Sequence, residues 1–281
     1  MSIRIIPRLD IKGINLVKGI QLEGLRVLGN PSEFAKFYYE NGADEILYMD
    51  VVASLYERNN LSSLIEDMAG ELFIPITVGG GIRTLKDINN VLKHGADKVL
   101  INSAAVKNPK FISAAAREYG SSTIVIGIEA IKQTDTSYLV YTDNGREYSG
   151  IDAVEWAKEV ENEGAGEIVI TSVNKEGIGD GFDYNLIKQI SDVTNISLIA
   201  NGGAGSKEDI LKLAGMNNVN AISIASLFHY NFIKNNNYVY TNSNEGNFDF
   251  LSKKETNKNH STISIKDLKT YLNKNGINVR L

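Results

Sequence analysis

The sequence predicts a closed (β/α)8 barrel, the TIM-barrel class of α/β fold, formed as a single domain over residues 1–281. Apolar segments of strand length alternate eight times with segments of helical pattern, and the alternation occurs as two related halves, at about residues 1–120 and 121–281. Eight parallel strands, each followed by a helix, are best explained by a sheet that closes into a barrel. A doubly wound open sheet is the alternative.

The relation between the halves is clearest in a stretch that occurs twice, at residues 74–88 and 196–210. Each copy reads as an apolar strand, a glycine turn and a helix. One constant offset in the numbering places Thr84 on Ser206, and an aspartate follows each of them three positions later. This arrangement is typical of a capping box, which sets where a helix begins.

The first half contains four pairs of strand and helix. Asn30 followed by Pro31 marks the first helix start, because asparagine is a preferred N-cap and proline is tolerated at the first helical position. The preceding glycine-containing loop carries Lys12, Lys18 and Arg26 and is expected to act as a lid. Strands are expected at 3–10, 45–50, in the copy at 74–88 and at 98–102, with helices at 30–40, 61–69, in the same copy and at 109–118.

The second half repeats the pattern and adds two insertions. An alternating run around the Asp-Asn-Gly of 143–145 predicts a hairpin over 134–150. Trp156 is expected on the inner face of the next helix. The asparagine-rich segment 233–261 reads as an insertion before the last helix, either a surface loop or a segment that contacts the substrate. Strands are expected at 123–129, 167–172, in the copy at 196–210 and at 221–225, with helices at 151–163, near Leu186, in the same copy and at 265–273.

Composition excludes several classes of function. The chain has no cysteine, which excludes disulfides, thiolate zinc sites and a cysteine nucleophile. Its three histidines lie far apart in the sequence, so we expect neither a metal site nor a cofactor. A net charge of −5 disfavours a nucleic-acid surface. Without a long apolar run or a signal-peptide pattern, the sequence predicts a cytoplasmic protein with no membrane partner.

Two carboxylates are the candidate catalytic residues. In a (β/α)8 barrel the chemistry sits at the carboxyl ends of the strands. Asp10 and Glu129 end the first and fifth strands, which lie opposite each other, so a substrate over the mouth would meet one carboxylate on each side. Such a pair is suited to general acid and base catalysis. Alternatively, each carboxylate holds a loop by pairing with Lys12 or Lys132.

The duplicated glycines are candidate phosphate sites. Without Cβ atoms, backbone amides at a strand end can approach an anion closely. The alternative is that the glycines only form tight turns. Two such cradles would suit an elongated substrate with an anion at each end. The candidate anion-binding residues are Lys18, Gly80, Gly81, Asn102, Thr171, Gly177, Gly202, Gly203, Ala225 and Ser226.

Several longer motifs identify a family resemblance. They are Asp-Ile-Lys from Asp10, Leu-Val-Lys-Gly from Leu16, Val-Gly-Gly-Gly from Val78, Ala-Asp-Lys-Val-Leu-Ile-Asn-Ser-Ala-Ala from Ala96, Gly-Ala-Gly-Glu-Ile from Gly164, Asn-Gly-Gly-Ala-Gly from Asn201 and the closing Gly-Ile-Asn-Val-Arg-Leu. With these motifs the chain resembles the cyclase subunit of imidazole glycerol phosphate synthase, the HisF family. The resemblance covers nearly the whole chain except 233–261.

The resemblance implies a lyase of histidine biosynthesis. Such a subunit combines ammonia with a bis-phosphorylated ribulosyl aminoimidazole carboxamide nucleotide. The family uses two aspartates as its acid and base; Asp10 matches the first, whereas Glu129 stands at the second. Because of the extra methylene, the carboxylate is displaced by about an ångström, a shift that can be catalytically costly. Other departures on the active face are Arg8, Val52, Glu176 and Ile178.

The resemblance also implies an ammonia port at the barrel floor. The corresponding charged residues begin the first, second, fourth and sixth strands: Arg4, Glu45, Lys98 and Glu167. Alternating charges can pair to exclude water while neutral ammonia passes. Alternatively, the ring only stabilises the barrel. Because a chain without cysteine cannot release ammonia from glutamine by thiolate attack, a separate HisH-like glutaminase is implied, docked where Asp97 could contact it.

Two further interpretations stay open. The changes at Glu129, Glu176 and Ile178 are compatible with a paralogue that delivers ammonia to another acceptor. An example is amidino-group formation in the biosynthesis of surface sugars such as nonulosonic acids. The chain could also be a catalytically silent subunit that only conducts ammonia.

Overall fold

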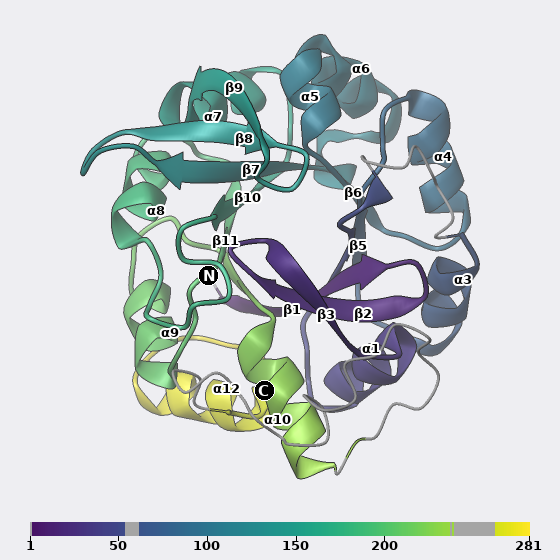
Figure 1. Ribbon diagram of the computed structural model, residues 1–281, viewed down its shortest axis with the longest axis vertical. Helices are drawn as coiled ribbons and strands as arrows, with labels where there is room; N and C mark the ends of the chain where they lie inside the picture. The colour runs from purple at the N-terminus through teal and green to yellow at the C-terminus, as the bar shows by residue number, and fades with distance from the viewer. Residues whose placement is uncertain (1, 54–61, 237, 239–261) are drawn as a thin grey trace.

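A computed structural model describes residues 2–53, 62–236, 238 and 262–281, and the structural statements below concern these residues. Within them, eight parallel strands close into a barrel surrounded by helices (Figure 1). The ring is complete because β12 pairs with β1 and β10 pairs with both β7 and β11. The predicted (β/α)8 barrel is confirmed. Its strands are β1 (Arg4–Lys12), β4 (Ile46–Asp50), β5 (Ile76–Gly79), β6 (Lys98–Ile101), β7 (Ile124–Lys132), β10 (Glu167–Ser172), β11 (Ser197–Asn201) and β12 (Ala221–Ile224).

The helices cover the outer face of the barrel through their apolar sides. Trp156, expected on an inner face, is fully buried in α7. None of the helices in the described part of the chain is long and apolar enough to cross a membrane. The helices are α1 (Pro31–Glu40), α3 (Ser62–Glu71), α4 (Leu85–Lys93), α5 (Ser103–Lys107), α6 (Lys110–Tyr119), the 3-10 turn η1 (Ser121–Thr123), α7 (Ala153–Asn162), α8 (Tyr184–Ser191), α9 (Lys207–Ala214), α10 (Ser226–Asn235) and α12 (Ile265–Lys274).

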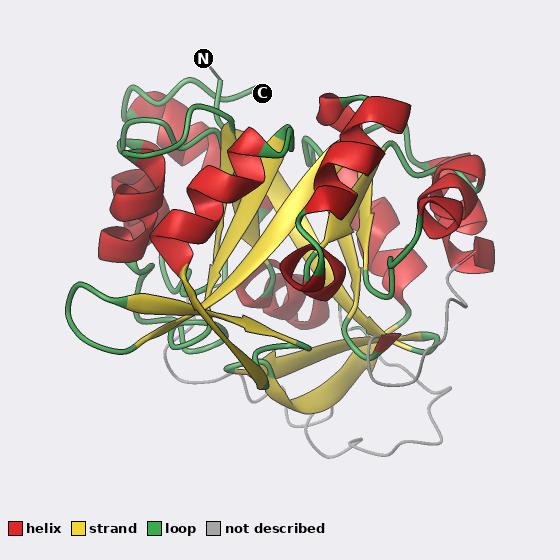
Figure 2. Cartoon of the chain, turned by 90° about the horizontal axis from the view of Figure 1, so that it is seen from above, coloured by secondary structure: helices red, strands yellow, loops and turns green. Residues whose placement is uncertain are grey.

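Two antiparallel hairpins project from the end of the barrel at which the strands finish, here called the mouth (Figure 2). One consists of β2 (Asn15–Ile20) and β3 (Glu23–Gly29), and it replaces the expected lid loop. It forms because β1 continues past its barrel section and pairs with β2. The other consists of β8 (Tyr138–Thr142) and β9 (Glu147–Asp152) and confirms the predicted hairpin, which ends two residues later than expected.

Helices directly follow β6 and β12, at positions where only the ends of strands were expected from the sequence. α5 begins after Asn102 and α10 begins after Ala225. α10 also occupies the first part of the predicted insertion 233–261. Most of that insertion, 237 and 239–261, lies outside the described residues.

The barrel interior is layered because alternate side chains of a strand point to opposite faces. On β1 the inward residues are Arg4, Ile6, Arg8 and Asp10, from the end where the strands begin, here called the floor, to the mouth. A middle layer of apolar side chains separates charged groups at the floor from polar groups at the mouth. This layer consists of Ile6, Leu47, Leu100, Val125, Val169, Ile199 and Ala221.

Both predicted capping boxes are present. The Thr84 hydroxyl accepts from the amide of Asp87, whose carboxylate accepts from the amide of Thr84. Ser206 and Asp209 repeat these bonds at the start of α9. The duplicated sequence thus sets two helix starts by the same local chemistry.

We expect Thr84→Ala to lower the free energy of unfolding by about 1 kcal/mol, because it removes the side-chain oxygen that accepts from the Asp87 amide in the first turn of the helix. Urea unfolding monitored by circular dichroism measures the change. Lys86→Ala, an exposed substitution in the same first turn, is the control and should change stability by less than about 0.5 kcal/mol. Equal effects of the two substitutions would contradict the capping role.

Candidate active site at the barrel mouth

Asp10 lies buried at the mouth on the inward face of β1. Its Oδ1 accepts from Arg8 Nε at 2.7 Å, and both side chains are 4% exposed. Burial alone would lower the pKa of Arg8, but Asp10 and Glu176 outweigh burial and raise it above its ordinary value. Arg8 is therefore a permanent cation, and the Asp10 carboxylate is held against it rather than against a loop lysine.

Glu129 lies buried in β7, which continues past it to Lys132. Its Oε2 accepts from the amide of Gly145, in the turn of the β8–β9 hairpin, at 2.8 Å. Burial raises the pKa of Glu129 to about 7, although Arg8, the Gly145 amide and the Asn102 side chain act in the opposite direction. A carboxyl group with this pKa can gain or lose a proton near neutral pH. The alternative partner Lys132 instead pairs with Asp135 at 2.9 Å.

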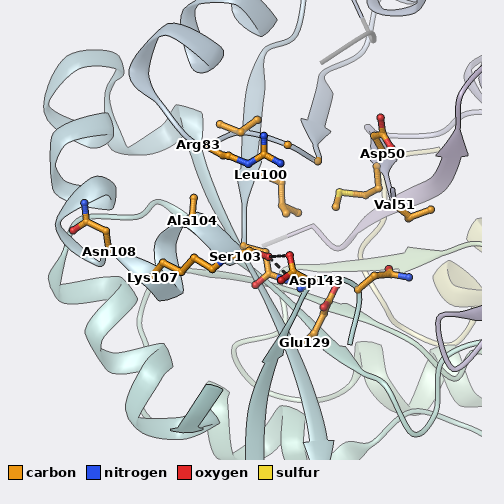
Figure 3. Close-up of a pocket in the computed structure, with 16 residues that line it drawn as sticks. Asp50, Val51, Arg83, Leu100, Ser103, Ala104, Lys107, Asn108, Glu129 and Asp143 are labelled. Atoms are coloured by element: carbon orange, nitrogen blue, oxygen red, sulfur yellow. Dashed lines mark hydrogen bonds between the residues drawn. The ribbon is translucent and has the colours of Figure 1, made fainter. Parts of the chain in front are cut away.

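The first glycine cradle opens into a cavity of about 310 Å³ (Figure 3). Gly80 and Gly81 have φ values of 103° and 70°, which favour glycine. A Cβ atom on Gly80 would come within 2.3 Å of the Asp50 carbonyl oxygen. The cavity connects this cradle with Glu129. Its lining includes Asp50, Gly80, Gly81, Arg83, Asn102, Ser103, Lys107, Asn108, Glu129 and Asp143.

The second glycine cradle is nearly filled. Gly202 and Gly203 also have positive φ values, 90° and 110°. The cavity there is only about 20 Å³, space for about one water molecule. It is lined by Glu176, Gly177, Asn201, Gly202, Gly203, Ala204, Ser223, Ile224, Ala225 and Ser226. The structure therefore groups most of the predicted residues in the two cradles, but Lys18 and Thr171 line neither cavity, and the space in the two differs.

Lys18 reaches this region from the β2 strand of the first hairpin. Its Nζ forms a buried ion pair with Glu176 Oε1. Burial by itself lowers the pKa of Lys18, but Glu176 and then Asp10 outweigh burial, and the pKa is raised. Lys18 is therefore charged although buried.

A polar network joins the centre of the mouth to the second cradle. Arg8 Nη1 lies 3.5 Å from Thr171 Oγ1, and Asn201 Nδ2 donates to the same oxygen at 3.2 Å. With its amide reversed, Asn201 instead accepts from Arg8 Nη1 at 3.1 Å, so it joins the network in both orientations. Asn201 is not among the residues predicted from the sequence, and Arg8 was expected only as a departure from the family. The two-residue alternation along β1 is the signal that would have placed Arg8 beside Asp10.

The four charged floor residues form a closed ring of ion pairs. Arg4 contacts Glu45 at 2.8 Å and Glu167 at 2.7 Å, and Lys98 contacts the same carboxylates at 3.1 and 2.9 Å. Burial would raise the pKa of Glu167, but Arg4 and Lys98 outweigh it and lower the pKa. Thr77 donates a further hydrogen bond to Glu45 Oε1 at 2.5 Å. Every carboxylate of the ring is thus paired twice.

Asp97 lies exposed at the floor, directly before β6. Its Oδ2 accepts from the backbone amide of Ile76 at 2.8 Å. Asp44 and Asn220 make the same contact to the amides of neighbouring strands, at 2.8 and 2.9 Å. Asp97 therefore has a structural bond within the chain, which the sequence did not reveal. Within the described ranges no group of three or more His, Cys, Asp or Glu side chains is arranged to hold a metal ion.

Comparison with known proteins agrees with this architecture. The profile of a family described as "Histidine biosynthesis protein" matches residues 4–234. Proteins from three bacteria, each named imidazole glycerol phosphate synthase subunit HisF, are similar over most of their length. The one from Legionella pneumophila is 55% identical over 208 residues, 74% of this chain and 98% of the relative.

The other two relatives extend the coverage. The protein from Petrotoga mobilis is 43% identical over 279 residues, 99% of this chain and 98% of the relative. The protein from Lactococcus lactis subsp. cremoris (strain MG1363) is 48% identical over 228 residues, 81% of this chain and 88% of the relative. From the barrel with its duplicated cradles and from these matches, we conclude that the chain belongs to the HisF family of imidazole glycerol phosphate synthase subunits.

Proposed function

We propose that the chain is the cyclase subunit of an imidazole glycerol phosphate synthase, a cytoplasmic lyase of histidine biosynthesis. It would combine ammonia with a bis-phosphorylated ribulosyl aminoimidazole carboxamide nucleotide. The observation that carries this proposal is the layering of the interior, with a paired ring of charges at the floor, an apolar middle layer and two carboxylates at the mouth. Membership of the HisF family supports the same reaction.

Ammonia would enter through the floor. The four charged side chains pair with one another at 2.7 to 3.1 Å, so water and ions would gain little binding free energy there. Neutral ammonia, in contrast, can pass when a pair opens. The apolar layer above the ring offers no groups that would protonate or hold it. A HisH-like glutaminase docked on the floor would supply the ammonia, since this chain has no cysteine nucleophile. The relatives are likewise named as subunits.

The two carboxylates would divide the proton transfers. Asp10 stands beside the permanent Arg8 cation and would act as the base. Glu129, with a pKa of about 7, would act as the acid on the opposite side of the mouth. The first cradle, around Gly80, Gly81 and Asn102, would bind one phosphate. The second would use Lys18, Thr171, Gly177, Gly202, Gly203, Ala225 and Ser226.

A second candidate function is favoured by the same site. Arg8 is engaged with Asp10, and Glu176 lies in the second cradle, which suits a paralogue that delivers ammonia to an acceptor of different shape. Turnover of the bis-phosphorylated nucleotide by the isolated chain with ammonium salts distinguishes the two. Product formation supports the cyclase. Its absence, with phosphate still bound, would favour the other acceptor or a silent conduit.

We predict that Asp10→Asn lowers the ammonium-driven turnover number at least about a hundredfold, because the amide keeps the shape but cannot act as a base. The control is Asp135→Asn, which removes an exposed carboxylate that pairs with Lys132. Thermal unfolding of both variants shows whether the fold persists around the unpaired Arg8. Turnover within about threefold of wild type would contradict the assignment.

The raised pKa of Glu129 predicts a pH-dependent stability. Between pH 4.5 and about 7 the folded chain keeps Glu129 protonated, whereas the unfolded chain has lost this proton. The contribution of Glu129 to the free energy of unfolding is therefore fully present below pH 4.5. About 3 kcal/mol of it is lost as the pH rises to about 7. Denaturant unfolding of wild type and Glu129→Gln across this range measures the difference. A wild-type curve parallel to that of the variant would contradict the buried, protonated state.

If the glutaminase docks on the floor, Asp97→Lys should weaken the coupling between glutamine hydrolysis and product formation. Glutamine-driven turnover of the mixed subunits should fall more than ammonium-driven turnover, because the charge faces the partner and the mouth is unchanged. Loss of an interfacial charge pair costs about one to several kcal/mol. Asp97→Asn is the matched control, since its amide oxygen can still accept from the Ile76 amide. Equal loss in both assays would make Asp97 purely structural.

A further inference from the structure

The turn of the β8–β9 hairpin contains three consecutive residues with left-handed backbone. Asp143, Asn144 and Gly145 have φ values of 51°, 61° and 75°. Glycine adopts this backbone readily, whereas aspartate and asparagine adopt it at a cost in free energy. Such a conformation persists where its surroundings hold it. Each of the three residues makes a contact of its own at the mouth.

Two of these contacts join the turn to the barrel wall. The Gly145 amide donates to Glu129 Oε2 at 2.8 Å. The Asp143 amide donates to Ser103 Oγ at 3.1 Å, and the Ser103 hydroxyl donates to Asp143 Oδ1 at 3.1 Å (Figure 3). Ser103 is the first residue of α5, just past β6. The amide that binds Glu129 therefore belongs to a turn that is anchored on the barrel.

The third contact joins the turn to the tip of the β2–β3 hairpin. Asn144 Nδ2 donates to the Leu22 carbonyl at 2.9 Å. The Leu22 side chain is only 3% exposed, and a Cβ atom on Gly145 would lie 3.3 Å from its Cδ1. The preceding amide, of Gln21, donates to the Glu176 carbonyl at 2.8 Å. The tip of the first hairpin is thus seated between the second hairpin and the loop after β10.

The placement of the Glu129 carboxylate depends on this turn. A glutamate side chain has one more rotatable bond than an aspartate, so other groups must bind its carboxylate to keep it in one position. The Gly145 amide supplies such a bond, and the Asn102 side chain also acts on the carboxylate. Misplacement of a reacting group by about an ångström can be catalytically costly.

Resting on the function proposed above, in which Glu129 is the acid, we propose that Asn144 is a positioning residue that links the seating of the first hairpin to the placement of Glu129. Asn144 and Gly145 are neighbours in one tight turn. When the hairpin tip leaves, the turn loses a contact that holds its left-handed backbone, and the Gly145 amide shifts from Glu129. Proton donation is thereby confined to a substrate that the hairpin covers.

Asn144→Gly tests this link, because glycine keeps the left-handed backbone but removes the side-chain donor. Hydrogen exchange, followed residue by residue by NMR in the free chain, should be at least about tenfold faster than in wild type at the Gln21 and Gly145 amides. The ammonium-driven turnover number should fall at least about tenfold, with KM within about threefold of wild type. Arg146→Ala, an exposed change beside the turn, should behave as wild type.

Three outcomes would overturn the inference. Unchanged exchange at Gly145 would show that the hairpin tip and the turn are independent. Faster exchange with an unchanged turnover number would make the contact purely structural. Because Asn144 also lines the first cavity, a raised KM with an unchanged turnover number would make it a substrate-binding residue instead.

A second variant and the exchange measurement keep the test decisive. If Asn144→Gly does not fold, Asn144→Asp, which keeps the size of the side chain but replaces its donor, must show the same effects. A wild-type chain without turnover of the nucleotide would count against the proposed function. The exchange rates need no substrate, so they would still decide whether Asn144 links the hairpin to the turn.

Discussion

Closure of the sheet is the constraint on which this molecule depends. In a closed barrel every second side chain of each strand must point into a narrow interior, where a charge is tolerated only when it is paired. On β1 this constraint places Arg4, Ile6, Arg8 and Asp10 in one inward row. The floor ring, the apolar layer and the Arg8–Asp10 pair are consequences of that row and its neighbours.

The same constraint gives the two mouth carboxylates different properties. Asp10 shares its strand face with a cation two residues away, whereas Glu129 projects from the opposite wall and bonds to a hairpin amide. Burial then raises the pKa of Glu129 to about 7. The polar network through Thr171 and Asn201 connects Arg8 at the centre of the mouth to the second cradle.

Local patterns in the sequence were sufficient for the barrel, the caps at Thr84 and Ser206 and the position of Trp156, because these features depend on neighbouring residues and on periodicity. The floor ring was expected from the family resemblance, and the structure brings its four members together. Features made by distant segments were missed. The ion pair of Lys18 with Glu176 and the bond of Asp97 to the Ile76 amide depend on which strands become neighbours, which no local pattern encodes.

Passage of ammonia from the floor to the mouth can be tested by isotope competition in the assembled enzyme. The complex with a glutaminase would receive glutamine labelled with 15N at the amide, in a solution containing excess unlabelled ammonium. Mass spectrometry of the product then reports the source of its nitrogen. The product should retain the label from glutamine, because ammonia would move from the floor to the mouth without mixing with solvent. Product labelled only in proportion to the ammonium in bulk solution would contradict it.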